Sequence, residues 1–349
     1  MFSKLKSLIF KFDPETAHNL AIKSLKFNFV SNIFDENKND PMFQTNLFGR
    51  QIENPIGLAA GFDKNAEVYN PLFRLGFGFV EVGTVTPLKQ FGNSTPRVFR
   101  LEEDQALINR LGFNSSGANN VNSTIRSNTP NGLLGVNIGP NKNTKDKLND
   151  YIICLKTFHD IADYITINIS SPNTENLRDF HDQNKFEKLI SSIEKEMKEL
   201  KSNTPIVVKI SPDILNEQAA QISEILLNHN IKAIIVSNTT EGNREKLLNA
   251  SKNQKGGLSG KPLETRSNQL INTFYNLLKG KISIIGVGGV DSGRSAYTKF
   301  LAGANFIQLY TGMVYQGPNI VAKIKKELKE LLINKDVSNF QDIIGKKKN

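Results

Sequence analysis

The stretch that decides the fold is residues 163–174, which read DYITINISSPNT. Isoleucines alternate at positions 165, 167 and 169, a pattern that predicts a buried β-strand ending at Pro172. Because a strand end holds neighbouring side chains at fixed angles, the polar groups that follow can converge on one small polar molecule. A capped turn leading into a helix is the alternative interpretation, since the sequence SPNT at 171–174 is also typical of turns. The polar groups in question are Asn168, Ser171, Asn173 and Thr174.

Similar apolar runs, rich in Val and Ile, recur on both sides of this strand. Helical patterns separate most of them, and eight buried strands alternating with helices indicate parallel βαβ units that close into a barrel. The sequence therefore predicts an α/β fold, a (β/α)8 TIM barrel with an N-terminal two-helix extension. An open doubly wound sheet is the competing architecture. The predicted strands are residues 55–60, 79–85, 133–138, 164–169, 206–210, 233–236, 282–287 and 306–309.

Polar and glycine-rich segments stand where the predicted strands end, as a barrel with a reactive face requires. After the last two strands, Gly288, Gly289 and Gly312 leave backbone N–H groups exposed beside a helix start, which suits a phosphate group. The segment is not a dinucleotide fingerprint, because the first strand carries no matching glycine pattern and acidic partner. These loops predict a phosphorylated cofactor.

Two lysines also stand at strand ends. Lys209 follows two valines inside a strand and is expected to point into the barrel. At about 4 Å its charge would be worth on the order of 4 kcal/mol to an anionic partner, such as a reduced flavin. Lys64 could hold the carboxylate of a substrate.

An amide set suits a planar ring with alternating N–H and C=O groups, because an unpaired buried donor costs about 1–3 kcal/mol. The set comprises Asn109, Asn137, Asn168, Asn173 and Asn238.

The composition is that of a globular protein, with 38% hydrophobic and 22% charged residues in a chain of 349. A single cysteine, Cys154, excludes a disulfide framework and a Cys-rich metal site, and four scattered histidines form no zinc pattern. We therefore expect no bound metal. The net charge of +10 suits nucleic acid, an anionic membrane or an acidic ligand, and does not choose among them. The sequence has neither an apolar run of eighteen residues nor a secretory signal pattern.

Residues 1–40 differ in character from the rest, and two short amphipathic helices are predicted there. The second begins at Asp13, with this residue as cap and a proline in the first turn. Apolar faces flanked by lysines suit an anionic membrane surface, and packing on the main domain is the alternative. We divide the chain into this segment, a barrel over residues 41–335 and a basic tail over residues 336–349.

Six motifs occur in order along the chain: AAGFDK at 59–64, NRLGFN at 109–114, NISSPNT at 168–174, SNTT at 237–240, GGLSG at 256–260 and IGVGG at 285–289. Together they resemble the motif series of the dihydroorotate dehydrogenases. The segment DPETAH at 13–18 resembles the helical extension of the membrane-associated, quinone-using class, which the cytosolic classes lack. The resemblance covers most of the chain.

The resemblance implies an FMN enzyme that oxidises dihydroorotate to orotate in pyrimidine synthesis and passes the electrons to a membrane quinone. It implies that Ser171 removes the C5 proton while hydride leaves C6 for the flavin, with Thr174 and an ordered water as the proton relay. A free serine is a poor base, so its neighbours must assist it, and base catalysis of this kind contributes roughly 10²–10⁴-fold. Cytosolic relatives use cysteine as the base. Cys154 lies about a helix before the strand and is interpreted as structural.

The same resemblance assigns the binding residues. For dihydroorotate they are Lys64, Asn109, Arg110, Leu111, Gly112, Phe113, Asn168, Asn173, Asn238 and Thr239. For FMN they are Ala59, Ala60, Gly61, Phe62, Asp63, Thr84, Asn137, Asn168, Lys209, Ser237, Gly260, Gly289, Tyr310 and Thr311. For a quinone tunnel between the N-terminal helices and the flavin they are His18, Arg100 and Tyr310. Ser237 and Phe62 replace the commoner Thr and Leu, both mild departures.

With this resemblance, the N-terminal helices are expected to contact lipid and admit the quinone. We expect a peripheral protein on the cytoplasmic side of a bacterial cell membrane, reversibly bound, with no nucleic-acid partner. The rival enzyme class is tRNA-dihydrouridine synthase, another FMN barrel whose RNA substrate would suit the +10 charge. It needs a cysteine acid in an active-site loop, and the position of Cys154 argues against that. A non-enzymatic barrel that docks on membranes is disfavoured by the polar strand ends.

Overall fold

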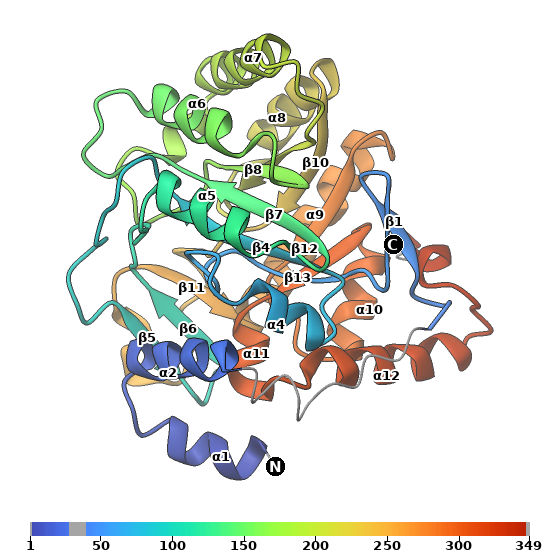
Figure 1. The fold of residues 1–349 in the computed structure, drawn as a ribbon. Coiled ribbons are helices and arrows are strands. Elements are labelled where there is room, and N and C mark those ends of the chain that lie inside the picture. The colour runs from blue at the N-terminus through green and yellow to red at the C-terminus, as the bar shows by residue number, and fades with distance from the viewer. Residues whose placement is uncertain (1, 28–39, 347–349) are drawn as a thin grey trace.

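Eight parallel strands close into a barrel surrounded by helices (Figure 1). The structure is a computed structural model and describes residues 2–27 and 40–346. Each barrel strand pairs with the next barrel strand along the chain, and the last closes onto the first, so the predicted (β/α)8 barrel is confirmed. In chain order the strands are β3 (Ile56–Leu58), β4 (Phe79–Val85), β7 (Leu133–Ile138), β8 (Tyr164–Asn168), β9 (Ile206–Ile210), β10 (Ile231–Val236), β12 (Ser283–Val287) and β13 (Phe306–Leu309).

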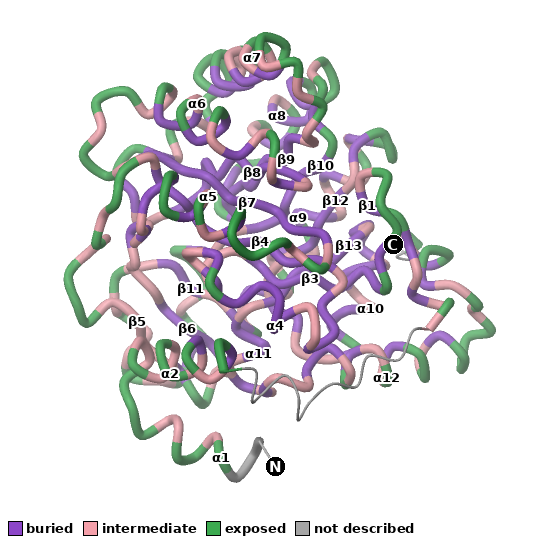
Figure 2. The backbone as a smooth tube through the Cα atoms, viewed as in Figure 1, coloured by how far each residue is buried: buried purple, intermediate pink, exposed green. Residues whose placement is uncertain are grey.

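The helices pack their apolar faces on the barrel, and the barrel interior is buried throughout (Figure 2). In α7 the apolar positions at three- and four-residue steps are the buried ones, as amphipathic spacing predicts. Cys154 in α6 is fully buried, which agrees with a structural role. The covering helices are α4 (Tyr69–Arg74), α5 (Ala118–Ser127), α6 (Lys147–Phe158), α7 (Gln183–Glu199), α8 (Asn216–Asn228), α9 (Glu264–Leu278), α10 (Gly293–Leu301), α11 (Thr311–Gln316) and α12 (Ile320–Ile333).

A small hairpin closes the amino-terminal end of the barrel. Its strands are β1 (Thr45–Leu47) and β2 (Arg50–Ile52), and Leu47 and Ile52 pack with large residues from the barrel strands. Tyr164 is the largest contributor on β8, and its ring fits because β7 carries Gly135 opposite: a Cβ there would lie 2.1 Å from the ring. The ring and its hydroxyl therefore reach the centre of the barrel floor.

A second sheet stands beside the carboxyl ends of the barrel strands, and we did not predict it. It is antiparallel, with β5 (Val98–Leu101) and β6 (Ala106–Asn109) forming a hairpin and β11 (Gly257–Gly260) pairing with β6. The sequence does contain a local indication of the hairpin, because two short strand-like runs, 98–101 and 106–109, flank the polar residues EEDQ. The third strand pairs with a segment far away along the chain, so no local pattern indicated it.

The N-terminal extension consists of α1 (Phe2–Ile9) and α2 (Pro14–Lys26), as predicted. The Asp13 carboxylate caps α2 by accepting from the backbone N–H groups of two following residues. Leu5, Leu8 and Phe12 are about half exposed, whereas Ile22 and Leu25 of α2 are buried on the barrel. The segment thus both packs on the main body and presents apolar side chains. The predicted boundary at residue 40 adjoins residues 28–39, which lie outside the described residues.

No helix in the described part of the chain combines the length and the apolar character needed to cross a bilayer.

The described part of the predicted C-terminal tail packs on the barrel. A short 3₁₀ turn, η4 (Phe340–Ile343), buries Phe340 against Phe300 of α10, with ring centroids 5.1 Å apart. Lys347 and Lys348 of the predicted basic end lie outside the described residues.

His229, between α8 and β10, forms a pH-dependent contact with α7. Its two ring nitrogens each lie 2.8 Å from a carboxylate oxygen, one of Glu187 and one of Glu194, so the doubly protonated ring satisfies both. Burial lowers the pKa of His229, but the hydrogen bonds that its ring donates to the two carboxylates outweigh burial and hold the pKa above its ordinary value of 6.5. Because this pKa is higher in the folded chain than in the unfolded chain, the contact stabilises the fold fully at pH values below the pKa of the unfolded chain. The stabilisation is lost as the pH rises through the pKa of the folded chain.

We therefore expect His229→Gln to lower the free energy of unfolding by about 0.5–1 kcal/mol at pH 6, a partly screened contribution, and by less at pH 9. Urea unfolding of the wild type and the variant at both pH values measures the difference. A destabilisation of equal size at the two pH values would contradict a charged contact.

Candidate functional site

A pocket opens between the carboxyl ends of the barrel strands and the sheet of β5, β6 and β11. Most residues predicted from the sequence lie in its wall, because parallel strands bring their ends to one face. These are Ala59, Ala60, Gly61, Lys64, Thr84, Asn109, Leu111, Gly112, Phe113, Asn168, Ser171, Asn173, Lys209, Ser237, Asn238, Thr239, Gly260, Gly289, Tyr310 and Thr311.

Several wall residues were not predicted as site residues. They come mainly from the second sheet and its turns, which is why strand-end reasoning about the barrel did not find them. These residues include Val98, Gln105, Leu107, Ser259, Lys261, Asp291 and Tyr315.

The amides at the base of the pocket hold one another in fixed orientations. Asn168 donates from Nδ2 to Thr84 Oγ1 at 3.0 Å and to Asn137 Oδ1 at 3.1 Å, and the Thr84 hydroxyl donates to the same Asn137 oxygen at 2.6 Å. Asn238 Nδ2 donates to Ser170 Oγ at 2.8 Å. Asn137 itself lies below the pocket wall, fully buried. Mutual hydrogen bonding of this kind preorganises the polar groups that remain free to meet a ligand.

Ser171 and Thr174 lie in the loop that follows β8. Ser171 is 5% exposed and lines the pocket, and its Oγ accepts a hydrogen bond from the Asn173 backbone N–H at 3.2 Å. Thr174 is also buried but lies outside the pocket wall, where its carbonyl accepts from Leu177 N–H. The Ser171 hydroxyl is therefore the group of this pair that faces a ligand.

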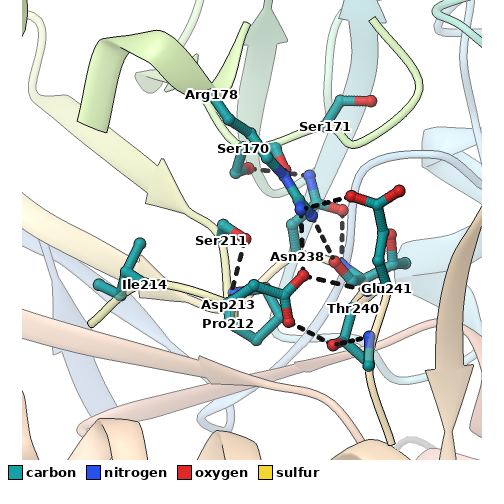
Figure 3. Close-up of polar contacts among 12 residues, drawn as sticks. Ser170, Ser171, Arg178, Ser211, Pro212, Asp213, Ile214, Asn238, Thr240 and Glu241 are labelled. Carbon is teal, nitrogen blue, oxygen red and sulfur yellow. Dashed lines mark hydrogen bonds and ion pairs between the residues drawn. The ribbon is translucent and has the colours of Figure 1, made fainter. Parts of the chain in front are cut away.

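Arg178, which sequence reasoning missed, ties this loop to two others (Figure 3). Its Nε donates to the Ser170 carbonyl at 3.2 Å, and its terminal nitrogens donate to the Thr239 carbonyl and form ion pairs with Asp213 at 3.0 Å and Glu241 at 2.9 Å. One rigid guanidinium thus fixes the ends of β8, β9 and β10 relative to one another. The loop that carries the predicted base is held in place by this arrangement.

Lys64 contacts the N-terminal extension at the edge of the pocket. Its Nζ lies 3.4 Å from Nε2 of His18 in α2. The His18 ring packs edge-on against Phe62 at 5.2 Å between centroids, and Phe62 packs edge-on against Tyr310 at 5.7 Å. Burial and, secondarily, the Lys64 charge lower the pKa of His18 to about 3, and burial lowers the pKa of Lys64 to about 8. His18 is therefore neutral at pH 7 and lies in an aromatic cluster beside the pocket.

Three further predicted residues lie outside the pocket wall. The Asp63 carboxylate accepts from two backbone N–H groups that precede α4, and burial raises its pKa to about 6. The Arg100 guanidinium donates to two backbone carbonyls between α1 and α2, including Phe10 at 2.8 Å. The Arg110 side chain turns away from the pocket, lies over the Phe99 ring and donates to Gln254. Of these three, Arg100 is the one that joins the extension to the second sheet, through β5.

Lys209 brings a buried positive group to the base of the pocket, as its position in β9 predicted. It is 5% exposed and pairs in register with Asn168 of β8. Burial lowers the pKa of its ammonium group, and the carboxylate of Glu81 opposes that shift. The pocket thus combines a buried lysine, oriented amides and a hydroxyl, a set suited to a polar, electron-accepting ring.

The family model for dihydroorotate dehydrogenase matches residues 42–332. The chain is 45% identical to the dihydroorotate dehydrogenase (quinone) of Bartonella tribocorum over 97% of this chain and 94% of the relative. It is 41% identical to the mitochondrial dihydroorotate dehydrogenase (quinone) of Mus musculus, over 95% of this chain and 86% of the relative.

Among solved structures, the fold matches a crystal structure of DHODH from Eimeria tenella in complex with ferulenol. The TM-score is 0.91 at 36% sequence identity, covering 96% of this chain and 95% of the other. Strand-end motifs, pocket and comparisons agree. The chain belongs to the dihydroorotate dehydrogenase family, and the relatives it matches over nearly its full length are the quinone-dependent oxidoreductases of that family.

Proposed function

We propose that the chain oxidises (S)-dihydroorotate to orotate in de novo pyrimidine synthesis, with FMN as cofactor and a membrane quinone as the final electron acceptor. The observation that carries the proposal is that Ser171, Lys209 and four amides of the set line one pocket at the strand ends; the amides are Asn109, Asn168, Asn173 and Asn238. Family membership supports the substrate, and the similarity to enzymes named for quinone supports the acceptor.

The pocket fits FMN in its chemistry at both ends. At one end, Gly288 and Gly289 adopt φ values of 113° and 76°, which favour glycine, and they line the pocket together with Gly312 of α11, so that exposed backbone N–H groups could meet a phosphate there. At the other end, Lys209 and the amides match the N–H and C=O edge of the flavin ring. FMN held by these residues would supply the two-electron acceptor chemistry for hydride leaving substrate C6 and for later transfer of the electrons to the quinone. We assign FMN to Ala59–Gly61, Thr84, Asn168, Lys209, Ser237, Gly260, Gly289, Tyr310 and Thr311 in the wall, with Phe62, Asp63 and Asn137 behind them.

Dihydroorotate would lie beside Ser171, whose hydroxyl would take the C5 proton. Thr174, in the same loop, would pass that proton on through an ordered water. Lys64 would pair with the substrate carboxylate, since its ammonium lines the pocket. The ring would meet Asn109, Asn168, Asn173, Asn238 and Thr239, and the backbone of residues 110–113 would complete the wall.

The quinone would approach through the N-terminal extension. His18 and Tyr310 lie in the aromatic cluster beside the pocket, and Arg100 joins α1 and α2 to the second sheet. The exposed apolar side chains of α1 suit a lipid surface. We propose peripheral attachment to the cytoplasmic side of a bacterial cell membrane.

The visible spectrum of the purified protein, recorded without oxygen before and after adding dihydroorotate, tests this function. We expect a bound flavin band that bleaches on addition. A protein without flavin would refute the cofactor assignment. A bound flavin that dihydroorotate leaves oxidised would refute the substrate, and a dihydrouridine-containing RNA would then be tested.

A further inference from the structure

Lys299 of α10 is a fully buried lysine that lies outside the pocket wall. Its Nζ donates to Ser267 Oγ at 3.0 Å and to Asn268 Oδ1 at 2.8 Å, both in the neighbouring helix α9. Its aliphatic stem passes β12 at Gly286, where a Cβ would lie 2.8 Å from Lys299 Cδ. The strand therefore leaves room for this side chain by carrying glycine at that position.

A buried amine whose two partners are neutral is unfavourable for the stability of a barrel core. Hydrogen bonds to neutral groups offset only part of the solvation that the amine loses on burial. A methionine would fill a similar volume without that loss. The cost of burying Lys299 therefore points to a role beyond packing.

The contacts of Lys299 lead to the end of β12, where residues 287–290 form a segment of the pocket wall that we call the glycine loop. The Ser267 hydroxyl accepts from Lys299 and donates its own proton to the Val287 carbonyl at 2.6 Å. The same carbonyl accepts from the backbone N–H of Ser237, another wall residue, at 3.2 Å. The Val287 carbonyl thus fixes the point at which the glycine loop leaves the strand.

The glycine loop has little space in which to shift. A Cβ on Gly289 would lie 2.4 Å from Glu264 Cβ at the start of α9. A Cβ on Gly312 would lie 2.2 Å from the Val290 carbonyl, so the loop also contacts the first turn of α11 closely. Because the loop packs against both helix starts, a small movement of Ser267 in α9 would displace its backbone N–H groups.

We infer that Lys299 is a positioning residue for the phosphate end of the cofactor site, which fixes the glycine loop through the Ser267 hydroxyl. It thereby sets how strongly the protein prefers FMN to riboflavin, the same flavin without the phosphate. This inference rests on the proposal that the pocket holds FMN, with its phosphate at the glycine loop. The Lys299 amine can donate to Ser267 whether or not it is protonated.

Lys299→Met tests the inference because it removes the donor and keeps an unbranched apolar side chain. The measurement is the dissociation constant of the flavin-free, full-length protein for FMN and for riboflavin, from the change in flavin fluorescence on binding. We expect the affinity for FMN to fall about tenfold, the order of one lost hydrogen bond, and that for riboflavin to change less than about twofold. Ser267→Ala, which removes the link itself, should lower the preference for FMN in the same way.

Asn268→Ala is the matched control. It removes the other partner of Lys299 and leaves the contacts from Lys299 through Ser267 to Val287 in place. We expect it to keep the wild-type preference for FMN. In a Ser267→Ala background, Lys299→Met should cause no further loss of preference, since the link is already broken.

Three results would overturn the inference. They are an unchanged preference in Lys299→Met, an equal loss of affinity for both flavins, which a merely structural role would produce, and a wild type that binds FMN and riboflavin equally. If Lys299→Met does not fold, an unchanged preference in Ser267→Ala overturns the inference by itself. A wild-type protein that binds neither flavin would instead refute the proposed function, so the two failures are distinguishable.

Discussion

Replacing Ser171 with alanine is expected to slow reduction of the flavin by dihydroorotate about 10²–10⁴-fold, the usual contribution of a positioned base. Binding should persist, because within the described part of the chain the Ser171 hydroxyl accepts a single backbone hydrogen bond, and the rest of the wall is unchanged. Stopped-flow mixing without oxygen measures the reduction rate at saturating substrate, and titration of the flavin spectrum measures substrate affinity. A loss in rate at constant affinity identifies a group that acts in the chemical step.

Ser170→Ala is the matched control for this variant. It removes the same hydroxyl from the adjacent residue, which is buried and bonded to Asn168 rather than exposed to the pocket. We expect a much smaller loss of rate. Near-normal flavin reduction in Ser171→Ala would remove this residue from the mechanism.

Deleting residues 1–40 is expected to abolish efficient quinone turnover while sparing reduction of the flavin by dihydroorotate. The reason is spatial: α2 places His18 in the aromatic cluster at the pocket edge, whereas Ser171 follows strand β8 and Lys209 lies in strand β9 of the barrel. The two half-reactions are measured separately, with dihydroorotate in the absence of quinone and with a soluble quinone added to reduced enzyme.

His18→Ala is a second test of the quinone site, because this substitution leaves both N-terminal helices in place. It should impair the quinone half-reaction by roughly tenfold, the order of one lost contact of about 1.4 kcal/mol, and leave the first half-reaction close to wild type. An equal loss of both half-reactions in the deletion would mean that the extension is structural, consistent with its buried Ile22 and Leu25.

The barrel was predictable because its strands are short β-branched runs that a parallel sheet buries on both faces. Four of them, β4, β7, β9 and β13, begin and end where the sequence predicts. At β10 the prediction began two residues late, because exposed Lys232 interrupts the apolar run after Ile231. The pocket wall followed from the same reasoning, since strand ends share one face.

What the sequence left unpredicted depends on partners distant along the chain. No local pattern distinguishes Arg178 from a solvated charge, because its partners Asp213, Thr239 and Glu241 lie far along the chain and only the fold brings them beside it. Glu81 sits in an apolar run, where no local pattern distinguishes a buried carboxylate with four donors from a solvated one. Side-chain direction was also unpredictable at Arg110, whose neighbours line the pocket while its guanidinium does not.

The second sheet has a consequence for the order in which the protein matures on the ribosome. Its middle strand, β6, meets β11 only through pairings such as Leu107 with Ser259, which are 152 residues apart along the chain. Until that later segment emerges, the β5–β6 hairpin has an open edge that can pair with other chains. The wall of the pocket is likewise incomplete until then. We therefore expect the site that we propose for FMN to form late in synthesis, and nascent chains that end before residue 257 to aggregate more readily than longer ones.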